Sequence, residues 1–506
     1  MPQAKAKAVK KTAARRKAPA SGASRTKKPP KSTESGMILA WEDDPLVVSV
    51  PGPVAATPIR RPVPDLAAVA LRIEIKTQRA PAPKEYTPGT PEFRYWAAAD
   101  ALQRGIGFWT RLLPPTLKWY RTVGKTLRVD LDAGEDLNAY YTREGLEFFH
   151  ANVSGHAVFS GESPDVVCHE LGHALLDALR PQLFNAASIE AAAFHESFGD
   201  VSALLCALQL PSIRSRVLLQ TEGRLYRSSR HSRIAEQLGW AIRQVRPDAV
   251  DPDCLRNAVN SFFYMDPSKL PPDGPAGQLS SRPHSFSRVF TGAFLEMLGG
   301  MLRLLGPSEE NLLQASFDSG QILVDAIRRA PVVPAYFSQV AAAMLDADRS
   351  RFDGRYRDAL KSSFVRHGIL SLTAAAAKTS LPPEGPGMGM APEPSDAPEL
   401  PMAEIVASTY GLGVDRLLVH APSEPVRFQA FGAAPDLGES PSHGQAEDAQ
   451  YFLEDLLRRG RIDLGDHGDE ESRISHPFSK KTHRLVRSDG GLALERIRFD
   501  CGFDCE

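Results

Sequence analysis

The chain has 506 residues, of which 42% are hydrophobic and 24% charged, as in ordinary soluble globular proteins of several domains. Its net charge of −1 hides a basic start, because residues 1–36 carry eleven Lys or Arg and a single acid. No run approaches the ~18–20 apolar residues that cross a bilayer. Five scattered cysteines form no disulfide framework. Membrane-spanning and disulfide-stapled secreted proteins are therefore disfavoured.

Residues 1–36 combine basic side chains with Ala, Pro and Ser and are expected to form a disordered basic tail. The tail could touch nucleic acid or an anionic surface weakly, although a solubilising role is favoured. No apolar stretch follows it, so a secretory signal peptide is not indicated. We expect a cytoplasmic protein and leave export by another route open.

Residues 37–180 are expected to form an N-terminal lobe that contains a sheet and ends in a helix. A helical pattern from Arg94 stops at Pro114, and a second helical stretch over 165–210 breaks near 181–185. Short β-like runs occupy 46–50, 71–75, 127–131 and 146–151.

Residues 181–372 read as a helical lobe. Residues 373–402 contain seven prolines and are expected to be a linker. Residues 403–506 are expected to form a small α+β module, with one helix around 449–460 and a hairpin turning at 489–491. The predicted fold class is α+β: a sheet-containing lobe and a helical lobe meet at a cleft, and the small module follows.

The stretch VVCHELGHALLDALRP contains the pattern His-Glu-x-x-His. On a helix, His169 and His173 project from one face and can hold one metal ion. Glu170 then lies beside the ion, where a general base is needed. Leu176 and Leu179 stand at the Gly and third-His positions of the three-histidine variant, which excludes that variant. The motif also occurs by chance on solvated helices, but its apolar flanks indicate a buried helix, where unpaired charges are costly.

A catalytic zinc needs a third protein ligand, and the next predicted helix supplies candidates. In AAAFHESFGDVSALL, Glu196 and Asp200 lie four residues apart on one face. We expect Glu196 to ligate the ion and Asp200 to accept a hydrogen bond from a ligand histidine. His195 and Glu190 compete as ligands, but neither has an acid four residues downstream. The sequence thus predicts a site of two histidines and one glutamate that holds one Zn²⁺.

Beyond this motif, three further segments resemble those of thermolysin-like zinc metallopeptidases of the gluzincin group, and thermolysin is a known two-His, one-Glu zinc enzyme. They are LNAYYTREGLEFFHA (Leu137–Ala151), CLRNAV (Cys254–Val259) and RPHSFSRVFTGAFLEML (Arg282–Leu298). The segments follow the family's order, and with the closing helices the resemblance covers roughly residues 90–372.

The resemblance implies a two-lobed zincin fold and a zinc endopeptidase that acts on peptide or protein substrates. A metal-activated water would attack the peptide bond with Glu170 as general base. His284 would stabilise the transition state. Asn138 and Ala139 would hold the substrate backbone on an edge strand. Arg256 would bind a substrate carbonyl.

The resemblance also places Val166 and Leu255 in the pocket for the residue after the scissile bond, which predicts cleavage before Leu, Ile, Val or Phe. Three departures leave an alternative open. Phe184 replaces the family's second oxyanion donor, a tyrosine. No acid just precedes His284. Residues 201–221 lack carboxylates, so calcium is not expected at the family's usual site. The alternative is a catalytically weak or inactive zinc-stabilised binding or structural protein of the same fold.

The role of residues 403–506 is not indicated by any resemblance. His476, His483, Cys501 and Cys505 gather there, but their spacing favours surface histidines and free thiols over a second zinc site. Because a Pro-rich segment precedes the module, we expect it to be tethered and not packed as part of the cleft. A chain ending at Leu372 would then keep its zinc and its activity on small peptides.

Overall fold

The computed structural model describes residues 36–48, 53–77, 79–380, 399–422, 445–467, 480–488 and 491–500. The expected basic tail therefore lies, apart from residue 36, outside the described residues. The α-helices are α1 Pro91–Trp109, α2 Pro164–Leu179, α3 Gln182–Asn185, α4 Ile189–Ala207, α5 Pro211–Thr221, α6 Glu236–Val245, α7 Pro283–Leu305, α8 Glu309–Arg329, α9 Tyr336–Phe352, α10 Arg357–Arg366, α11 Leu372–Ser380 and α12 Gln445–Arg458.

The strands are β1 Met37–Ala40, β2 Leu46–Val48, β3 Pro53–Ala55, β4 Ile59–Pro62, β5 Ile73–Ile75, β6 Leu127–Asp130, β7 Ala139–Thr142, β8 Gly145–Phe148, β9 His150–Val153, β10 His156–Phe159, β11 Arg233–Ile234, β12 Arg256–Asn257, β13 Met402–Val406, β14 Arg416–His420, β15 Ile462–Asp463, β16 His483–Ser488, β17 Gly491–Arg496 and β18 Arg498–Asp500. Helices and mixed sheets occur together, which confirms the predicted α+β class.

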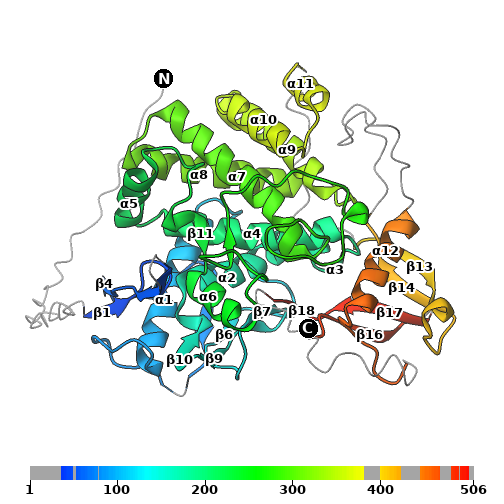
Figure 1. The fold of residues 1–506 in the computed structure, drawn as a ribbon, viewed down its shortest axis with the longest axis horizontal. Coiled ribbons are helices and arrows are strands. Elements are labelled where there is room, and N and C mark those ends of the chain that lie inside the picture. Colours follow the sequence, from blue (N-terminus) through cyan, green and yellow to red (C-terminus); the bar gives the residue numbers. More distant parts are fainter. Residues whose placement is uncertain are drawn as a thin grey trace, which may run out of the picture.

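A five-stranded sheet in the order β18-β7-β8-β6-β5 lies in the lower part of Figure 1. Strands β5, β6 and β8 run parallel, and β7 is antiparallel to β8. The apolar residues of β6 alternate with polar ones, so that Leu127 and Val129 are buried while Arg128 is exposed. Helix α2 packs against β7 and carries the His-Glu-x-x-His motif over this sheet.

The helices α7 to α10 lie above α2 and α4 in Figure 1. Helix α2 is buried along its whole length, as is α4, and the two pack against each other. Each begins at a serine: the Ser163 side chain accepts from the Val166 amide, and the Ser188 side chain from the Ala191 amide. Pro164 occupies the first turn of α2, where no amide donor is lost.

Two glycines bring α2 and α4 into close contact. A Cβ atom on Gly172 would lie 3.0 Å from the Cα of Gly199 and from the Cβ of Ser202. A Cβ atom on Gly199 would lie 2.6 Å from two atoms of the His169 ring. Glycine normally weakens a helix interior, so both positions sacrifice helix propensity for a short distance between the helices.

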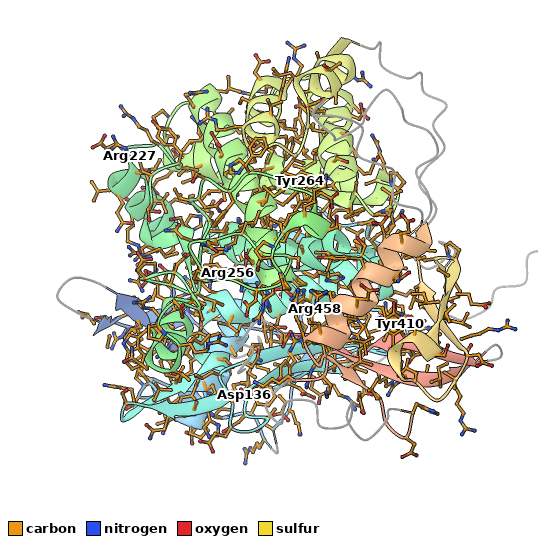
Figure 2. All side chains as sticks on the ribbon, turned by 45° about the vertical axis from the view of Figure 1, so that its right-hand side comes forward. Asp136, Arg227, Arg256, Tyr264, Tyr410 and Arg458 are labelled. Carbon is orange, nitrogen blue, oxygen red and sulfur yellow. The ribbon has the colours of Figure 1, made fainter. Side chains whose placement is uncertain are left out.

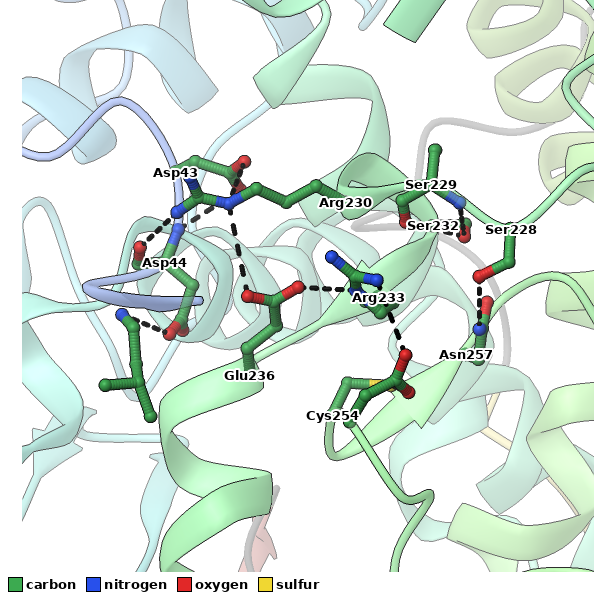
Figure 3. Close-up of polar contacts among 12 residues, drawn as sticks. Asp43, Asp44, Ser228, Ser229, Arg230, Ser232, Arg233, Glu236, Cys254 and Asn257 are labelled. Carbon is green, nitrogen blue, oxygen red and sulfur yellow. Dashed lines mark hydrogen bonds and ion pairs between the residues drawn. The ribbon is translucent and has the colours of Figure 1, made fainter. Parts of the chain in front are cut away.

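A buried polar network ties the first described strands to the start of α2. The Ser163 hydroxyl donates to the Asp44 carboxylate at 2.7 Å, and the same carboxylate accepts from the Gln237 amide. Figure 3 shows Arg230 reaching Asp43, Asp44 and Glu236. Residues near 44 and 230 thereby position the helix that carries the metal motif.

The C-terminal module contains a five-stranded sheet in the order β13-β14-β17-β16-β15 with α12 packed against it. The expected hairpin is confirmed, since Ser488 pairs with Gly491 at its turn. Part of the expected linker is helical, because the run Ala374–Ala377 strongly favours the helix α11. Residues 381–398 lie outside the described residues.

The expectation that the module stands apart from the cleft is wrong. Strand β18 leaves the module and pairs antiparallel with β7 in the other sheet, as Figure 1 shows near the chain end. The physical reason is that only Ile497 separates β17 from β18, so the chain runs directly from the sheet of the module to the strand beside β7. A chain ending at Leu372 would therefore lose the strand that pairs with β7.

Among the described residues, no helix is both long enough and apolar enough to cross a membrane.

The helix contact predicts an unusual response to Gly→Ala substitution. Gly199→Ala should lower the free energy of unfolding by ~1–3 kcal/mol, because the added methyl group overpacks against His169. Gly107→Ala in α1 is the matched control: nothing lies within 4 Å of its Cβ position, so this substitution should be neutral or stabilising by up to ~1 kcal/mol. Urea denaturation of the three proteins measures both values. Equal effects of the two substitutions would contradict the close contact.

Candidate metal centre

The predicted ligands converge between α2 and α4. The His169 Nε2 atom lies 3.4 Å from Glu196 Oε2, and the His173 Nε2 atom lies 3.7 Å from Glu196 Oε1. All three side chains are at most 2% exposed. Potential ligand atoms of His169, Glu170 and His173 also lie within 4.8 Å of one another. In that grouping Glu170 stands where the sequence analysis places Glu196.

The chemistry of these atoms fits a metal ion. His169 Nε2, His173 Nε2 and Glu196 Oε2 are buried, and none of them makes a hydrogen bond of normal geometry within the described residues. Buried polar atoms without such bonds cost folding free energy, which a bound cation would recover. Two imidazole nitrogens and one carboxylate oxygen form a donor set that suits zinc. Small side-chain adjustments would bring them to the ~2 Å bonds that zinc requires.

Asp200 lies where the sequence predicts it, behind His169, a predicted ligand. Its Oδ1 atom is 3.1 Å from Nδ1 of His169, on the side of the ring opposite to Nε2. Arg256 holds the same carboxylate with a 2.8 Å contact, and the Thr291 hydroxyl donates to it at 3.3 Å. A carboxylate in this position fixes the ring orientation and makes the ligand nitrogen more basic.

The two competing ligands have other partners. The Nδ1 atom of His195 lies 3.3 Å from Nδ1 of His173, so His195 contacts the side of that ring opposite to Nε2. The Glu190 carboxylate accepts from the Tyr264 hydroxyl at 2.6 Å and from the Phe337 amide at 2.8 Å. These contacts favour Glu196 over both residues.

The surroundings shift the pKa values of the three predicted ligands in different directions. Burial lowers the pKa of His169, but the Asp200 and Glu196 carboxylates outweigh this effect and raise it to about 9. Burial lowers the pKa of His173 to about 3. Burial raises the pKa of Glu196, yet His284 and His173 outweigh it and hold that pKa well below its usual range. Without an ion, His173 is therefore neutral at pH 7, whereas His169 is protonated on both ring nitrogens. Metal binding at Nε2 would release one of these two protons.

His284 and Glu170 lie next to the predicted ligands. His284 is in the first turn of α7, and its Nε2 atom is 3.1 Å from Glu196 Oε2. The same Nε2 lies 2.5 Å from the backbone carbonyl oxygen of Asp500, which can only accept, so His284 donates there. Glu170 is fully buried on α2. The structure thus places the expected base and the expected transition-state donor each beside a predicted ligand.

The sequence analysis missed the aromatic residue that covers this site. The Phe499 ring stacks on His195 at a centroid distance of 4.1 Å and on His173 at 4.9 Å. It also meets the edge of Phe184 at 5.4 Å. Phe184 is buried where the resemblance expects a tyrosine, so its ring packs without a hydroxyl donor. A three-residue strand at the chain end gives no periodic signal that could have identified Phe499.

The predicted substrate-binding residues lie at three separate places. Asn138 and Ala139 are buried at the start of β7, and the Asn138 side chain accepts from the Ala139 amide. Leu255 and Arg256 line a cavity of about 290 Å³ together with His284. Figure 2 shows Arg256 near the middle of the molecule in this view. Val166 is buried on α2 and is not among the residues that line this cavity.

Comparison with known proteins finds no matching family model and no curated relative. The likeness to thermolysin-like peptidases therefore stays a prediction from the sequence motifs.

The contact between Asp200 and His169 predicts a specific loss of metal affinity. Asp200→Asn should weaken zinc binding by ~10–100-fold, because the neutral amide no longer fixes and polarises the ligand ring. Asp177→Asn is the matched control. Asp177 is also a buried acid paired with an arginine, but it contacts Arg143 and Tyr141 instead of a ligand.

Competition with a chromophoric chelator gives the zinc affinity of each protein. The control should keep the affinity of the unaltered chain. A zinc affinity lowered equally by both substitutions would refute the role given to Asp200.

Proposed function

We propose that this protein is a zinc-dependent endopeptidase. The observation that carries the proposal is the convergence of His169, His173 and Glu196. Glu170 lies on the same helix as the two histidines, and His284 lies 3.1 Å from Glu196. A zinc ion bound there would activate water and polarise the scissile carbonyl. Peptide hydrolysis is the reaction for which this set of side chains is suited.

The chain's own residues have distinct roles in this proposal. Glu170 takes a proton from the attacking water and delivers it to the leaving amine. His284 donates from Nε2 to the oxygen on which negative charge develops, as it now donates to the Asp500 carbonyl. Asp200 orients His169, and Arg256 holds Asp200 through a buried ion pair.

A second function, zinc-stabilised binding without turnover, is favoured by two specific observations. Phe184 supplies no hydroxyl where the resemblance expects an oxyanion donor. Strand β18 also fills the edge beside β7 where a substrate would pair. In this case zinc would stabilise the helix pair, and the C-terminal module would make the functional contacts.

The cellular location belongs to the same proposal. The three described cysteines, Cys168, Cys206 and Cys254, are buried free thiols. Free thiols persist in reducing compartments, which supports the cytoplasm.

Glu170→Gln tests the enzyme proposal. The amide cannot accept the proton, so cleavage of casein and of a peptide library should fall by at least ~10²-fold. Zinc content should stay at one equivalent, because Glu170 is not a proposed ligand. Chelator should abolish the activity of the unaltered chain. Equal cleavage rates for the two proteins would refute the enzyme, and a chelator that lowers only thermal stability would favour the binding protein.

The residues that line the cavity beside His284 predict a substrate preference. Ala249, Val250 and Leu255 form an apolar part of its lining, which supports cleavage before Leu, Ile, Val or Phe. Mass spectrometry of products from a peptide library measures the preference directly. Because Arg246 and Arg288 also line the cavity, acidic residues are the informative competitors. A profile dominated by charged residues after the scissile bond would contradict the prediction.

A further inference from the structure

We propose that strand β18 acts as an internal pseudosubstrate that occupies the peptide-binding edge of the cleft and keeps the site latent. The inference rests on the proposed function, since it names what regulates the proposed site. Three contacts of β18 carry it: its pairing with β7, the burial of Phe499 and the position of the Asp500 carbonyl.

The first contact is strand pairing. Strand β7 pairs with β8 on one side and with β18 on the other, in the register Arg498↔Thr142, Phe499↔Tyr141 and Asp500↔Tyr140. Within the described residues, β7 would be an edge of its sheet if β18 were absent. An exposed edge offers backbone donors and acceptors to an extended peptide. β18 lies in register beside three consecutive residues of this edge.

The second contact is the Phe499 side chain. It is 2% exposed and stacks on His173, the proposed ligand, and on His195 behind it. The Arg496 guanidinium also lies over the Phe499 ring, 4.2 Å from its centroid. An aromatic side chain in this position closes one flank of the metal centre.

The third contact is made by the backbone of Asp500. Its carbonyl oxygen accepts from His284 Nε2 at 2.5 Å. That atom is the donor proposed for the substrate oxygen during hydrolysis. Pairing with β7 does not by itself require a contact with His284. The carbonyl therefore mimics a substrate carbonyl.

The module holds β18 in place. The Asp500 carboxylate accepts from the Arg461 guanidinium, with both oxygens at 3.2 Å. The Ile497 amide donates to the Thr482 carbonyl at 2.8 Å, and Arg496 donates to the Phe184 carbonyl at 2.8 Å. A segment tethered this closely has an effective concentration of order mM, which competes well with dilute peptides.

Two truncated chains test the proposal. One ends at Ile497 and lacks β18. The control ends at Gly502, so that it keeps β18 with the amide carbonyl of Asp500. Both carry Glu170→Gln, which prevents cleavage during a binding experiment. The probe is a fluorescein-labelled peptide with the sequence of residues 495–500, and fluorescence anisotropy measures its affinity.

The chain ending at Ile497 should bind the peptide at least ~10-fold more tightly than the control, because the tethered competitor is gone. Equal affinities, or no binding to a folded chain that ends at Ile497, would overturn the proposal. If circular dichroism shows that this chain is unfolded, Phe499→Ala in the full chain decides. That variant should bind the peptide more tightly and exchange the amide protons of residues 140–142 faster, and no change in either would overturn the proposal.

The same chains with Glu170 restored separate this inference from the proposed function. Higher peptide affinity without any hydrolysis would support the pseudosubstrate and refute the peptidase. Hydrolysis at the same rate with and without β18 would support the peptidase and overturn the pseudosubstrate. Faster hydrolysis after removal of β18 would support both.

Discussion

The close approach of α2 and α4 is the constraint on which the candidate site depends. Gly172 and Gly199 lack the side chains that would separate the helices, and the His169 ring fits against the Gly199 backbone. Only at this distance can residues of α2 and α4 face a common point, with Glu196 between two imidazoles and Asp200 behind one of them. The glycines weaken each helix slightly, and the dense packing of two wholly buried helices offsets that loss.

The buried carboxylates of Asp200 and Glu196 lie between the same two helices or beside them, and each has a neighbour that stabilises its charge. Burial disfavours each ionised group, and Asp200 and Glu196 each have a cationic or proton-donating neighbour. Asp200 has Arg256 and His169, and together they outweigh burial and lower its pKa to about 2. Glu196 has His284 at 3.1 Å. This arrangement keeps both carboxylates ionised, as the proposed divalent cation would require.

Local patterns in the sequence predicted the parts of the structure that depend on local spacing. The α+β class, the break between α2 and α4 and the hairpin at Ser488 and Gly491 follow from periodicity, capping and turn residues. The placement of Asp200 behind His169 followed from an i,i+4 spacing on one helix face. The position of β18 could not be predicted in this way. It pairs residues 498–500 with residues 140–142, and a strand of three residues has too short a pattern to reveal its partner.

The account predicts one zinc ion between α2 and α4, and anomalous diffraction at the zinc edge tests this most directly. Crystals of the full chain grown with zinc should show one strong peak at ~2 Å from His169 Nε2, from His173 Nε2 and from a Glu196 carboxylate oxygen. A peak bound elsewhere, or no peak between the two helices in zinc-saturated crystals, would contradict the account.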